Sequence, residues 1–316
     1  MTNCGSEVPA FCHPRMVVKQ IHSKEKSEGD GAIMRRSIIG GPELKNLDPF
    51  LLLDYGSVSP PAGFPDHPHR GFETVTYMLQ AFKHFHAFLG SQCYIKTDVI
   101  FLHREHSPTR TLQAIKWMTV GRGIVHSEMP ATRGTNEVLQ LWVNLSAANK
   151  MIEPSYQELQ EKDVVKVEKD GLRVSVIAGD CLGIKSPIYT RTPTMYLDVI
   201  MQPGAVFHQP IPEGWNAFAY ILEGTPTFGT VITPAISAHH TVQLGPGDGI
   251  SMWNKSDSVS RFVLIGGQPL NEPVVQHGPF VMNTWEEIKQ AIYDFQHAQN
   301  GFEKAASWRS DPVTYA

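Results

Sequence analysis

Apolar residues are grouped in short β-rich runs along most of the chain, with little helical periodicity before the last segment. Glycine, proline or aspartate lies near most of these runs, as expected where strands are joined by tight turns. Six runs predict strands, namely FETVTYML (72–79), LQLWVNL (139–145), RVSVIAG (173–179), MYLDVIM (195–201), FAYIL (218–222) and RFVLIGG (261–267). The pattern therefore predicts an all-β protein.

The last segment, residues 283–308, has a different period. Ile288, Ile292 and Phe295 recur at a spacing of three to four residues, which places them on one face of a helix. Thr284 and Glu287 precede this stripe at the spacing of a capping box, in which the two residues satisfy each other's backbone amides. A packed C-terminal helix is predicted here, broken near Asn300-Gly301.

Two distant strand runs resemble each other. Residues 72–81 align without gaps on residues 215–224, with aromatic, small and aliphatic residues in the same order and Tyr77 opposite Tyr220. Such a repeat indicates two similar β-barrels or sandwiches in tandem. Extended backwards, the same alignment places Pro210, Pro212 and Asn216 opposite His67, His69 and Glu73. The second copy is therefore predicted to lack the chemistry of those three side chains.

Composition narrows the class of protein. The chain has 316 residues, of which 41% are hydrophobic and 18% charged, so it can bury sizeable cores and is not a disordered tail. Its net charge of −4 argues against direct binding to nucleic acid. The four cysteines form no CxxC pair, and no secretory signal or membrane span is recognised. These features predict a soluble intracellular protein.

Histidine placement supplies the candidate chemistry. His67 and His69 lie two residues apart in GFPDHPHRGFE, and His126 and Glu128 have the same spacing in WMTVGRGIVHSEMP. Residues i and i+2 of a strand point to the same face, so two such pairs can converge on one ion inside a barrel. Three histidines and a carboxylate suit Fe(II), Mn or Ni better than a structural zinc. The alternative is that these are ordinary hydrogen-bonded histidines.

The same two segments closely resemble signature segments of the pirin family, bicupins of the cupin superfamily. Further similar segments are KMIEPSYQEL (150–159), GIKSPIYTRTPTMYLD (183–198), AHHTVQLGPGD (238–248), EPVVQHGPFVMNT (272–284) and NGFEKAASWRS (300–310). The sequence of these segments is most similar to plant members of the family. The resemblance implies two tandem jelly-roll cupin barrels and a short C-terminal helix. The expected division is a flexible N-terminal extension over 1–16, an N-terminal metal-binding cupin over 17–152, a charged linker over 153–171, a C-terminal cupin without metal over 172–282, a helical segment over 283–310 and a tail over 311–316.

The resemblance also implies a site and an activity. A single non-haem iron, Fe²⁺ or Fe³⁺, is expected on His67, His69, His126 and Glu128, with other divalent metals as alternatives. Glu73 is expected beside the metal without binding it. The implied activity is that of a quercetin 2,3-dioxygenase, in which a flavonol is cleaved by O₂ and Glu128 or Glu73 accepts its proton.

One stretch departs from the family. Ala81 replaces a glycine, and residues 81–116 are longer than the family's loop and lack its Pro-Gly-Asp turn, whereas Gly245-Pro246-Gly247-Asp248 is present in the second half. This segment predicts a mobile insertion and the loss of one or two strands beside the metal. An inactive isoform is therefore one alternative function.

A binding function is the other alternative. The resemblance implies a nuclear, iron-dependent redox sensor that acts as a transcriptional coregulator through a transcription factor or a G-protein α subunit. It also implies a monomer found in the nucleus and the cytoplasm.

Overall fold

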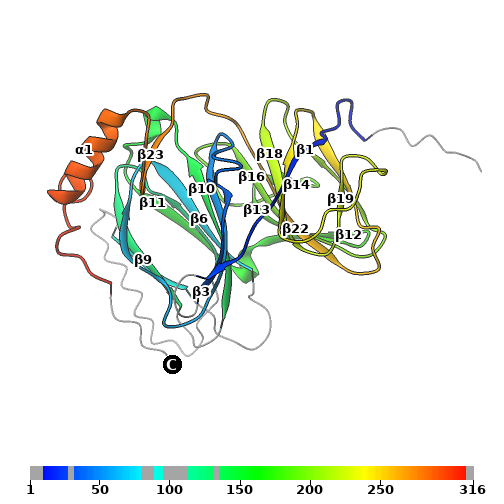
Figure 1. The fold of residues 1–316 in the computed structure, drawn as a ribbon, viewed down its shortest axis with the longest axis horizontal. Coiled ribbons are helices and arrows are strands. Elements are labelled where there is room, and N and C mark those ends of the chain that lie inside the picture. Colours follow the sequence, from blue (N-terminus) through cyan, green and yellow to red (C-terminus); the bar gives the residue numbers. More distant parts are fainter. Residues whose placement is uncertain (1–9, 28–31, 80–88, 95–112, 131–134, 311–316) are drawn as a thin grey trace, which may run out of the picture. The chain divides into compact units, whose positions relative to one another are not determined.

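The computed structural model describes residues 10–27, 32–79, 89–94, 113–130 and 135–310. Two compact units are present (Figure 1). We call Lys24–Val164 together with Leu270–Ala316 the first barrel, and Met1–Ser23 together with Val165–Pro269 the second barrel. Each unit is built from antiparallel strands, which confirms the predicted all-β class and the two tandem cupin barrels.

The first barrel has a seven-stranded sheet in the order β11-β8-β6-β10-β4-β3-β2 and a three-stranded sheet in the order β5-β9-β7. A small hairpin, β23-β24, accompanies them. The bounds are β2 Lys26–Ser27, β3 Ala32–Ile39, β4 Phe50–Val58, β5 Phe64–His69, β6 Phe72–Met78, β7 Leu89–Tyr94, β8 Gln113–Thr119, β9 Ile124–Pro130, β10 Asn136–Asn144, β11 Ser155–Gln160, β23 Val275–His277 and β24 Phe280–Met282. Two short 3₁₀ helices, Ala147–Asn149 and Glu161–Asp163, also belong to this unit.

The second barrel repeats this plan. Its seven-stranded sheet has the order β1-β20-β18-β22-β16-β13-β12, its three-stranded sheet has the order β17-β21-β19, and β14-β15 form a hairpin. The bounds are β1 Val17–His22, β12 Val165–Lys169, β13 Leu172–Ala178, β14 Asp180–Cys181, β15 Ile184–Lys185, β16 Thr194–Met201, β17 Val206–Pro210, β18 Asn216–Glu223, β19 Thr227–Phe228, β20 His240–Leu244, β21 Gly249–Trp253 and β22 Ser260–Gly267. All six predicted strands are present, within three residues of their expected bounds.

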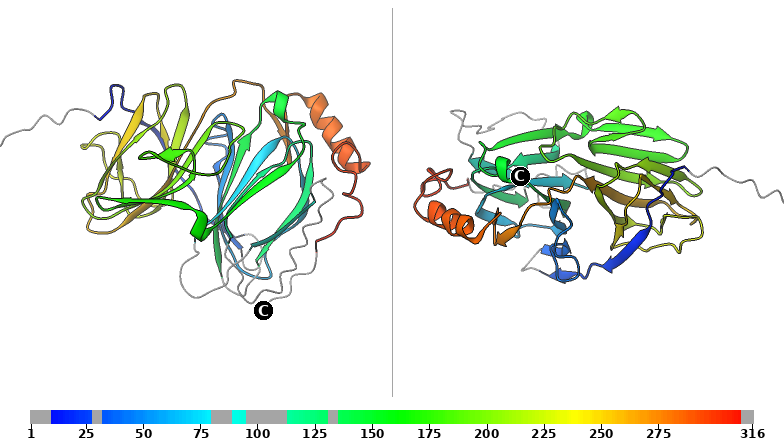
Figure 2. Two further views of the ribbon diagram at one scale, coloured as in Figure 1. Left: turned by 180° about the vertical axis from the view of Figure 1, so that it is seen from behind. Right: turned by 90° about the horizontal axis from the view of Figure 1, so that it is seen from above.

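Helix α1 (Trp285–Gln296) packs on the β23-β24 hairpin of the first barrel (Figures 1 and 2). The predicted capping box is present: Thr284 accepts a hydrogen bond from the Glu287 amide, and the Glu287 carboxylate accepts one from the Thr284 amide. The helix ends earlier than expected, with His297 as its last capping residue. No helix in the described part of the chain has the length and apolar character of a membrane span.

The two chain ends do not follow the predicted domain boundaries. Strand β1, expected in the N-terminal cupin, pairs with β20 of the second barrel. The residues just before it were expected to be flexible, but the described ones are held there too, because the buried Arg15 guanidinium donates to the carbonyl of Gly245. The C-terminal helix belongs with the first barrel.

The charged stretch 153–171, expected to be a linker, instead supplies β11 and β12. Each is the outermost strand of its own sheet. An edge strand exposes one face and one backbone edge, so a polar, charged sequence can form it, and charge on an edge also blocks unwanted pairing. The boundary between the units falls between Val164 and Val165.

Part of the atypical segment 81–116 is also ordered into strands. The backbone of β7 pairs with β9, and β8 pairs with β6 and β11, so these two strands complete their sheets. The expected loss of strands is not observed for them. Residues 80–88 and 95–112 lie outside the described residues.

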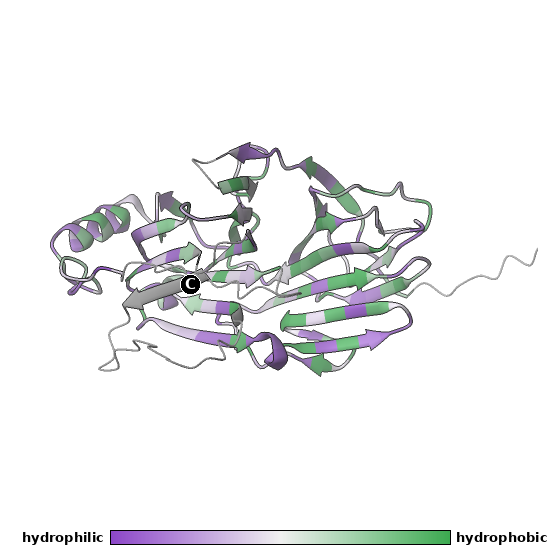
Figure 3. Ribbon diagram, turned by 90° about the horizontal axis from the view of Figure 1, so that it is seen from below, coloured by the Kyte–Doolittle hydropathy of each residue, from purple (hydrophilic) through white to green (hydrophobic). Residues whose placement is uncertain are grey.

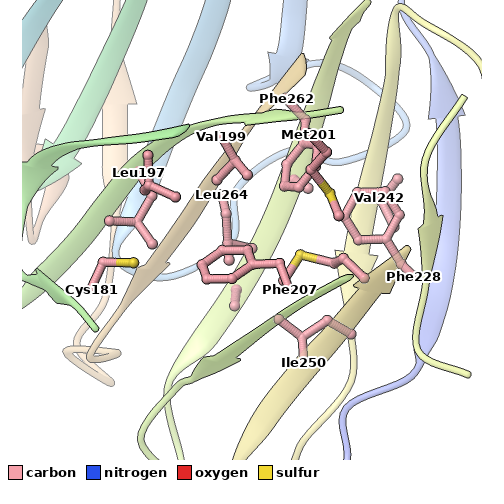
Figure 4. Close-up of a cluster of buried hydrophobic side chains, with 14 of the residues drawn as sticks. Cys181, Leu197, Val199, Met201, Phe207, Phe228, Val242, Ile250, Phe262 and Leu264 are labelled. Atoms are coloured by element: carbon pink, nitrogen blue, oxygen red, sulfur yellow. The ribbon is translucent and has the colours of Figure 1, made fainter. Parts of the chain in front are cut away.

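The interior of the second barrel is a packed apolar core. Alternate residues along the strands of its large sheet belong to one cluster of buried hydrophobic side chains. Figure 3 shows hydrophobic and hydrophilic residues alternating along many of the strands. Phe207, Phe228 and Phe262 belong to this core (Figure 4), and each is at most 1% exposed. The apolar side chains that fill this barrel stabilise its fold through close packing.

Strand register tests the internal repeat. In the first barrel Thr74 pairs with Met118 and Trp142, and in the second Ala217 pairs with Leu244 and Gly266. β6 therefore lies between β8 and β10 as β18 lies between β20 and β22, which agrees with the alignment of these two strands.

The backward extension of that alignment is wrong for the two histidines. Two residues separate β5 from β6, whereas five separate β17 from β18, so a gapless alignment slips by three residues. Pairing across the small sheets instead matches His67 and His126 with Phe207 and Met252. Gln209, two residues after Phe207, then takes the place of His69. The conclusion that the second copy lacks His67 and His69 is unchanged, because Phe207 and Gln209 replace them, and Met252 likewise replaces His126.

A candidate metal centre in the first barrel

Three histidines from two neighbouring strands meet inside the first barrel. His67 on β5 is directly paired with His126 on β9, and His69 lies two residues further along β5 on the same face. The ring centroids are 4.3 Å apart for His67 and His126, 4.7 Å for His67 and His69, and 4.9 Å for His69 and His126. One donor atom from each ring lies within 4.8 Å of the other two. The predicted histidines are therefore brought together at the spacing of a metal site.

Backbone carbonyls fix which nitrogen two of these rings present. His67 Nδ1 lies 2.7 Å from the carbonyl oxygen of Pro65, and His69 Nδ1 lies 3.4 Å from that of Pro279. A carbonyl can only accept a hydrogen bond, so Nδ1 carries the proton in both rings and Nε2 keeps its lone pair. Such contacts orient metal-binding imidazoles and select their tautomer.

His126 has unused binding capacity. It is fully buried, and neither of its ring nitrogens has a hydrogen-bond partner within the described residues. A buried polar atom without a partner is costly, and a metal ion would satisfy one of these nitrogens. Burial lowers the pKa of His126 well below its ordinary value and lowers the pKa of His69 to about 3, with the neighbouring imidazoles adding to the effect. Both rings are thus neutral at physiological pH, as metal ligands must be.

Glu128 is buried on β9 but is not a member of the donor cluster formed by the three histidines. Its Oε1 accepts a hydrogen bond from the Thr76 hydroxyl at 2.8 Å. Burial raises the pKa of Glu128, and the Thr76 hydrogen bond, His67 and the Lys116 ammonium partly offset this rise. The carboxylate is therefore held on the interior wall of the large sheet, with its proton affinity increased.

Glu73 lies on a different face from Glu128. Side chains alternate along β6, and Thr74 and Thr76 face the interior, where Thr76 contacts Glu128. Glu73 therefore points the other way, where it accepts a hydrogen bond from the Thr119 hydroxyl at 2.7 Å. The expectation that Glu73 lies beside the metal does not match this arrangement.

Sequence reasoning missed the polar wall that faces the histidines. The Thr76 hydroxyl also contacts Gln140 Oε1 at 2.8 Å, and Gln140 Nε2 donates to the Thr74 hydroxyl at 2.5 Å. Together with Glu128 these side chains give the first barrel a polar interior. A signal was present in the repeat, where Thr74 and Thr76 align with Ala217 and Ala219, because threonine at a core-facing position needs a polar partner.

Aromatic rings close the apolar side of the site. The His69 ring meets Phe72 and Trp142, each with centroids 5.1 Å away. Three imidazoles, a carboxylate close by and an aromatic wall are chemically suited to an Fe, Mn or Ni ion. Two cupin barrels, one with this donor set and one with an apolar core, define the class of protein as a bicupin.

Comparisons with known proteins agree with this class. The Pirin family model matches residues 31–143, and the Pirin C-terminal cupin domain matches residues 196–301. This chain belongs to the pirin family. It is 58% identical over 301 residues to the pirin-like protein of Solanum lycopersicum, with 95% of this chain and 98% of that protein covered. It is 51% identical over 298 residues to Homo sapiens pirin, with 94% and 97% covered.

A solved structure of a quercetin 2,3-dioxygenase from Acinetobacter baumannii is also similar. It is 28% identical, with a TM-score of 0.73, over 92% of this chain and 99% of that chain. This likeness extends through both barrels.

Proposed function

We propose that this protein is a metal-dependent dioxygenase that cleaves a flavonol such as quercetin, and that its metal is iron. The observation that carries the proposal is the cluster of the half-buried His67 with the buried His69 and His126, whose donor atoms lie within 4.8 Å of one another. The similarity to a quercetin 2,3-dioxygenase of Acinetobacter baumannii supports the choice of substrate.

His67 and His69 would hold the ion through the Nε2 lone pairs that their carbonyl contacts leave free, and His126 would hold it through a ring nitrogen that has no partner within the described residues. Bound there, the ion would act as a Lewis acid toward the 3-hydroxyl and 4-carbonyl oxygens of a flavonol and lower the pKa of that hydroxyl. Glu128 would bind the ion or receive the hydroxyl proton. A general base works best when its pKa is near the working pH, and burial moves the pKa of Glu128 in that direction.

The residues around the cluster match this chemistry. Phe72 and Trp142 form an apolar surface beside His69, against which a flat aromatic ring can pack. Thr76 and Gln140, further along the same two strands, and Glu128 on β9 supply hydrogen-bonding groups. Such a mixture of aromatic walls and a few polar groups is typical of small-molecule sites.

Metal content and quercetin turnover test the proposal together. We expect the purified wild type to contain close to one iron per chain by elemental mass spectrometry, and His67→Ala/His126→Ala to contain none. The matched control is His22→Ala/His240→Ala, which removes two neighbouring histidines of the second barrel, with ring centroids 4.8 Å apart. The control should keep both its metal and its activity.

Turnover is followed as loss of quercetin absorbance with matching O₂ uptake and carbon monoxide release. Equal rates in the wild type and in the double variant of the first barrel would contradict the proposed activity. A wild type that folds but binds no divalent metal would favour the inactive alternative that the 81–116 segment suggested.

A further inference from the structure

The strand that carries His67 and His69 continues directly into a buried arginine. Arg70 is 1% exposed, and its guanidinium donates three hydrogen bonds. Nη1 donates to Asp294 at 2.8 Å, Nη2 to the carbonyl of Asn300 at 2.6 Å, and Nε to the carbonyl of Arg122 at 2.6 Å. One side chain thereby joins the end of β5, the turn before β9 and the end of helix α1.

These three segments adjoin the strands and the carbonyl that position the histidines. β5 carries His67 and His69, and the turn at Arg122 leads into β9, which carries His126. The backbone of Arg70 is held from the same side, since its amide donates to the Pro279 carbonyl and its own carbonyl accepts from the Val281 amide. Pro279 is the residue whose carbonyl orients His69.

The carboxylate of Asp294, which pairs with Arg70, is held in its ionised form. Asp294 is fully buried on α1 and accepts hydrogen bonds from Gln290, Gln299 and Asn300 as well as from Arg70. Burial alone would raise the pKa of Asp294, but these hydrogen bonds outweigh it and lower the pKa. The pair therefore stays ionic at neutral pH, and loss of either charge would leave the other buried without its partner.

We propose that Arg70 and Asp294 are positioning residues for the metal centre, which set the orientation and tautomer of His69 through the Pro279 carbonyl. The proposal rests on the proposed function only in taking His69 to be a metal ligand. The C-terminal helix, far from the histidines in the sequence, would then be a part of the site.

The first test uses the full-length protein without metal. Long-range ¹H–¹⁵N correlation spectra of histidine side chains report which ring nitrogen carries the proton. In the wild type, we expect both His67 and His69 to be protonated at Nδ1. In Asp294→Asn, His69 should lose this preference, whereas His67 should keep it, because its orienting carbonyl at Pro65 is local.

A second ion pair provides the control. Arg261 and Asp198 make a two-point ion pair in the second barrel, with N···O distances of 3.1 and 2.7 Å. Arg261→Met should lower the melting temperature and leave the His69 tautomer unchanged. Where Asp294→Asn does not fold, Arg70→Lys serves instead, because it keeps the charge but cannot reach all three acceptors.

The second test is a titration with Co²⁺, monitored by its visible absorption. We expect Asp294→Asn to bind Co²⁺ about tenfold more weakly than the wild type and with an altered spectrum, and Arg261→Met to match the wild type. A folded Asp294→Asn protein with the wild-type His69 tautomer would overturn the positioning proposal. If the wild type binds no metal, the proposed function fails, and the tautomer measurement still decides the role of Arg70 and Asp294.

Discussion

The hydroxyl of Thr76 on β6 lies 2.8 Å from Oε1 of Glu128 on β9, so one hydrogen bond crosses the interior of the first barrel between its two sheets. Thr76 opposes the effect of burial on Glu128, because a donor to a carboxylate stabilises the charged form. This contact ties the candidate base to the large sheet, and it can be removed without changing the size of the side chain by much.

Thr76→Val should move the activity profile toward higher pH. Glu128 accepts a proton only when it is ionised, so the rate should rise with pH through its pKa. Loss of the hydrogen bond raises that pKa further, and the rising limb of kcat/KM against pH should shift upward. The control is Thr241→Val, at a buried threonine of the second barrel whose hydroxyl has no partner within the described residues. An unshifted profile in Thr76→Val would exclude Glu128 as the base that Thr76 tunes.

The metal-free protein should lose stability as the pH falls from 6.5 toward 3. Burial lowers the pKa of His69 to about 3, so the unfolded chain binds a proton in this range that the folded chain does not. Each such group costs up to about 1.4 kcal/mol of unfolding free energy per pH unit in that window. Urea denaturation with a chelator present should show this slope, and His69→Gln should reduce it. His240→Gln, at a less buried position, should have the wild-type slope, and an unchanged slope in His69→Gln would contradict the prediction.

Gly71→Ala should disrupt the first barrel. Gly71 has a φ of 92°, and a Cβ added there would lie 1.9 Å from the carbonyl oxygen of Val281. We expect a loss of about 3 kcal/mol in unfolding free energy, together with weaker metal binding, since β5 and β24 would be pushed apart. Gly204 is the matched control, because its φ is 79° and nothing lies within 4 Å of an added Cβ. Gly204→Ala should cost only about 1 kcal/mol and leave the metal in place. Equal losses in the two variants would show that space at Gly71 is not limiting.

Phe207→Ala should separate stability from metal binding. Phe207 is the structural counterpart of His67 in the second barrel and is 1% exposed within the apolar core. Its truncation should cost about 3–5 kcal/mol through the cavity it creates. Denaturation measurements and elemental mass spectrometry on the same samples should find a less stable protein with the wild-type metal content. Loss of metal from the folded variant would contradict the assignment of the site to the first barrel alone.

Local spacing was sufficient for much of the site. Two residues on a strand that are separated by one position share a face, so His67 with His69 and His126 with Glu128 could be paired from the sequence. The capping box at Thr284 was equally local, and the strand runs with their turns gave the all-β class. The repeat predicted the second barrel and its lack of His67 and His69, since an alignment needs no distances.

The remaining features depend on contacts between residues far apart in the chain. The gapless alignment of the two repeats failed at the loop before β18. This loop is longer than its counterpart before β6, and the matching residues of the strands give no sign of the difference. The pairing of β1 with the second barrel depends on how whole elements pack. The same holds for the contact of Asp294 with Arg70. Iron as the metal, protein partners, and a nuclear and cytoplasmic location stay predictions, because they depend on other molecules.

The sequence by itself thus determined which side chains could converge, through the two-residue period of a strand. Only the tertiary structure decided which of them do: the three histidines meet, Glu128 is held by Thr76, and Glu73 faces away from both. The physical reason is that the strand period fixes the face of each side chain, whereas the pairing register and packing of β5, β6 and β9 fix the distances across the barrel.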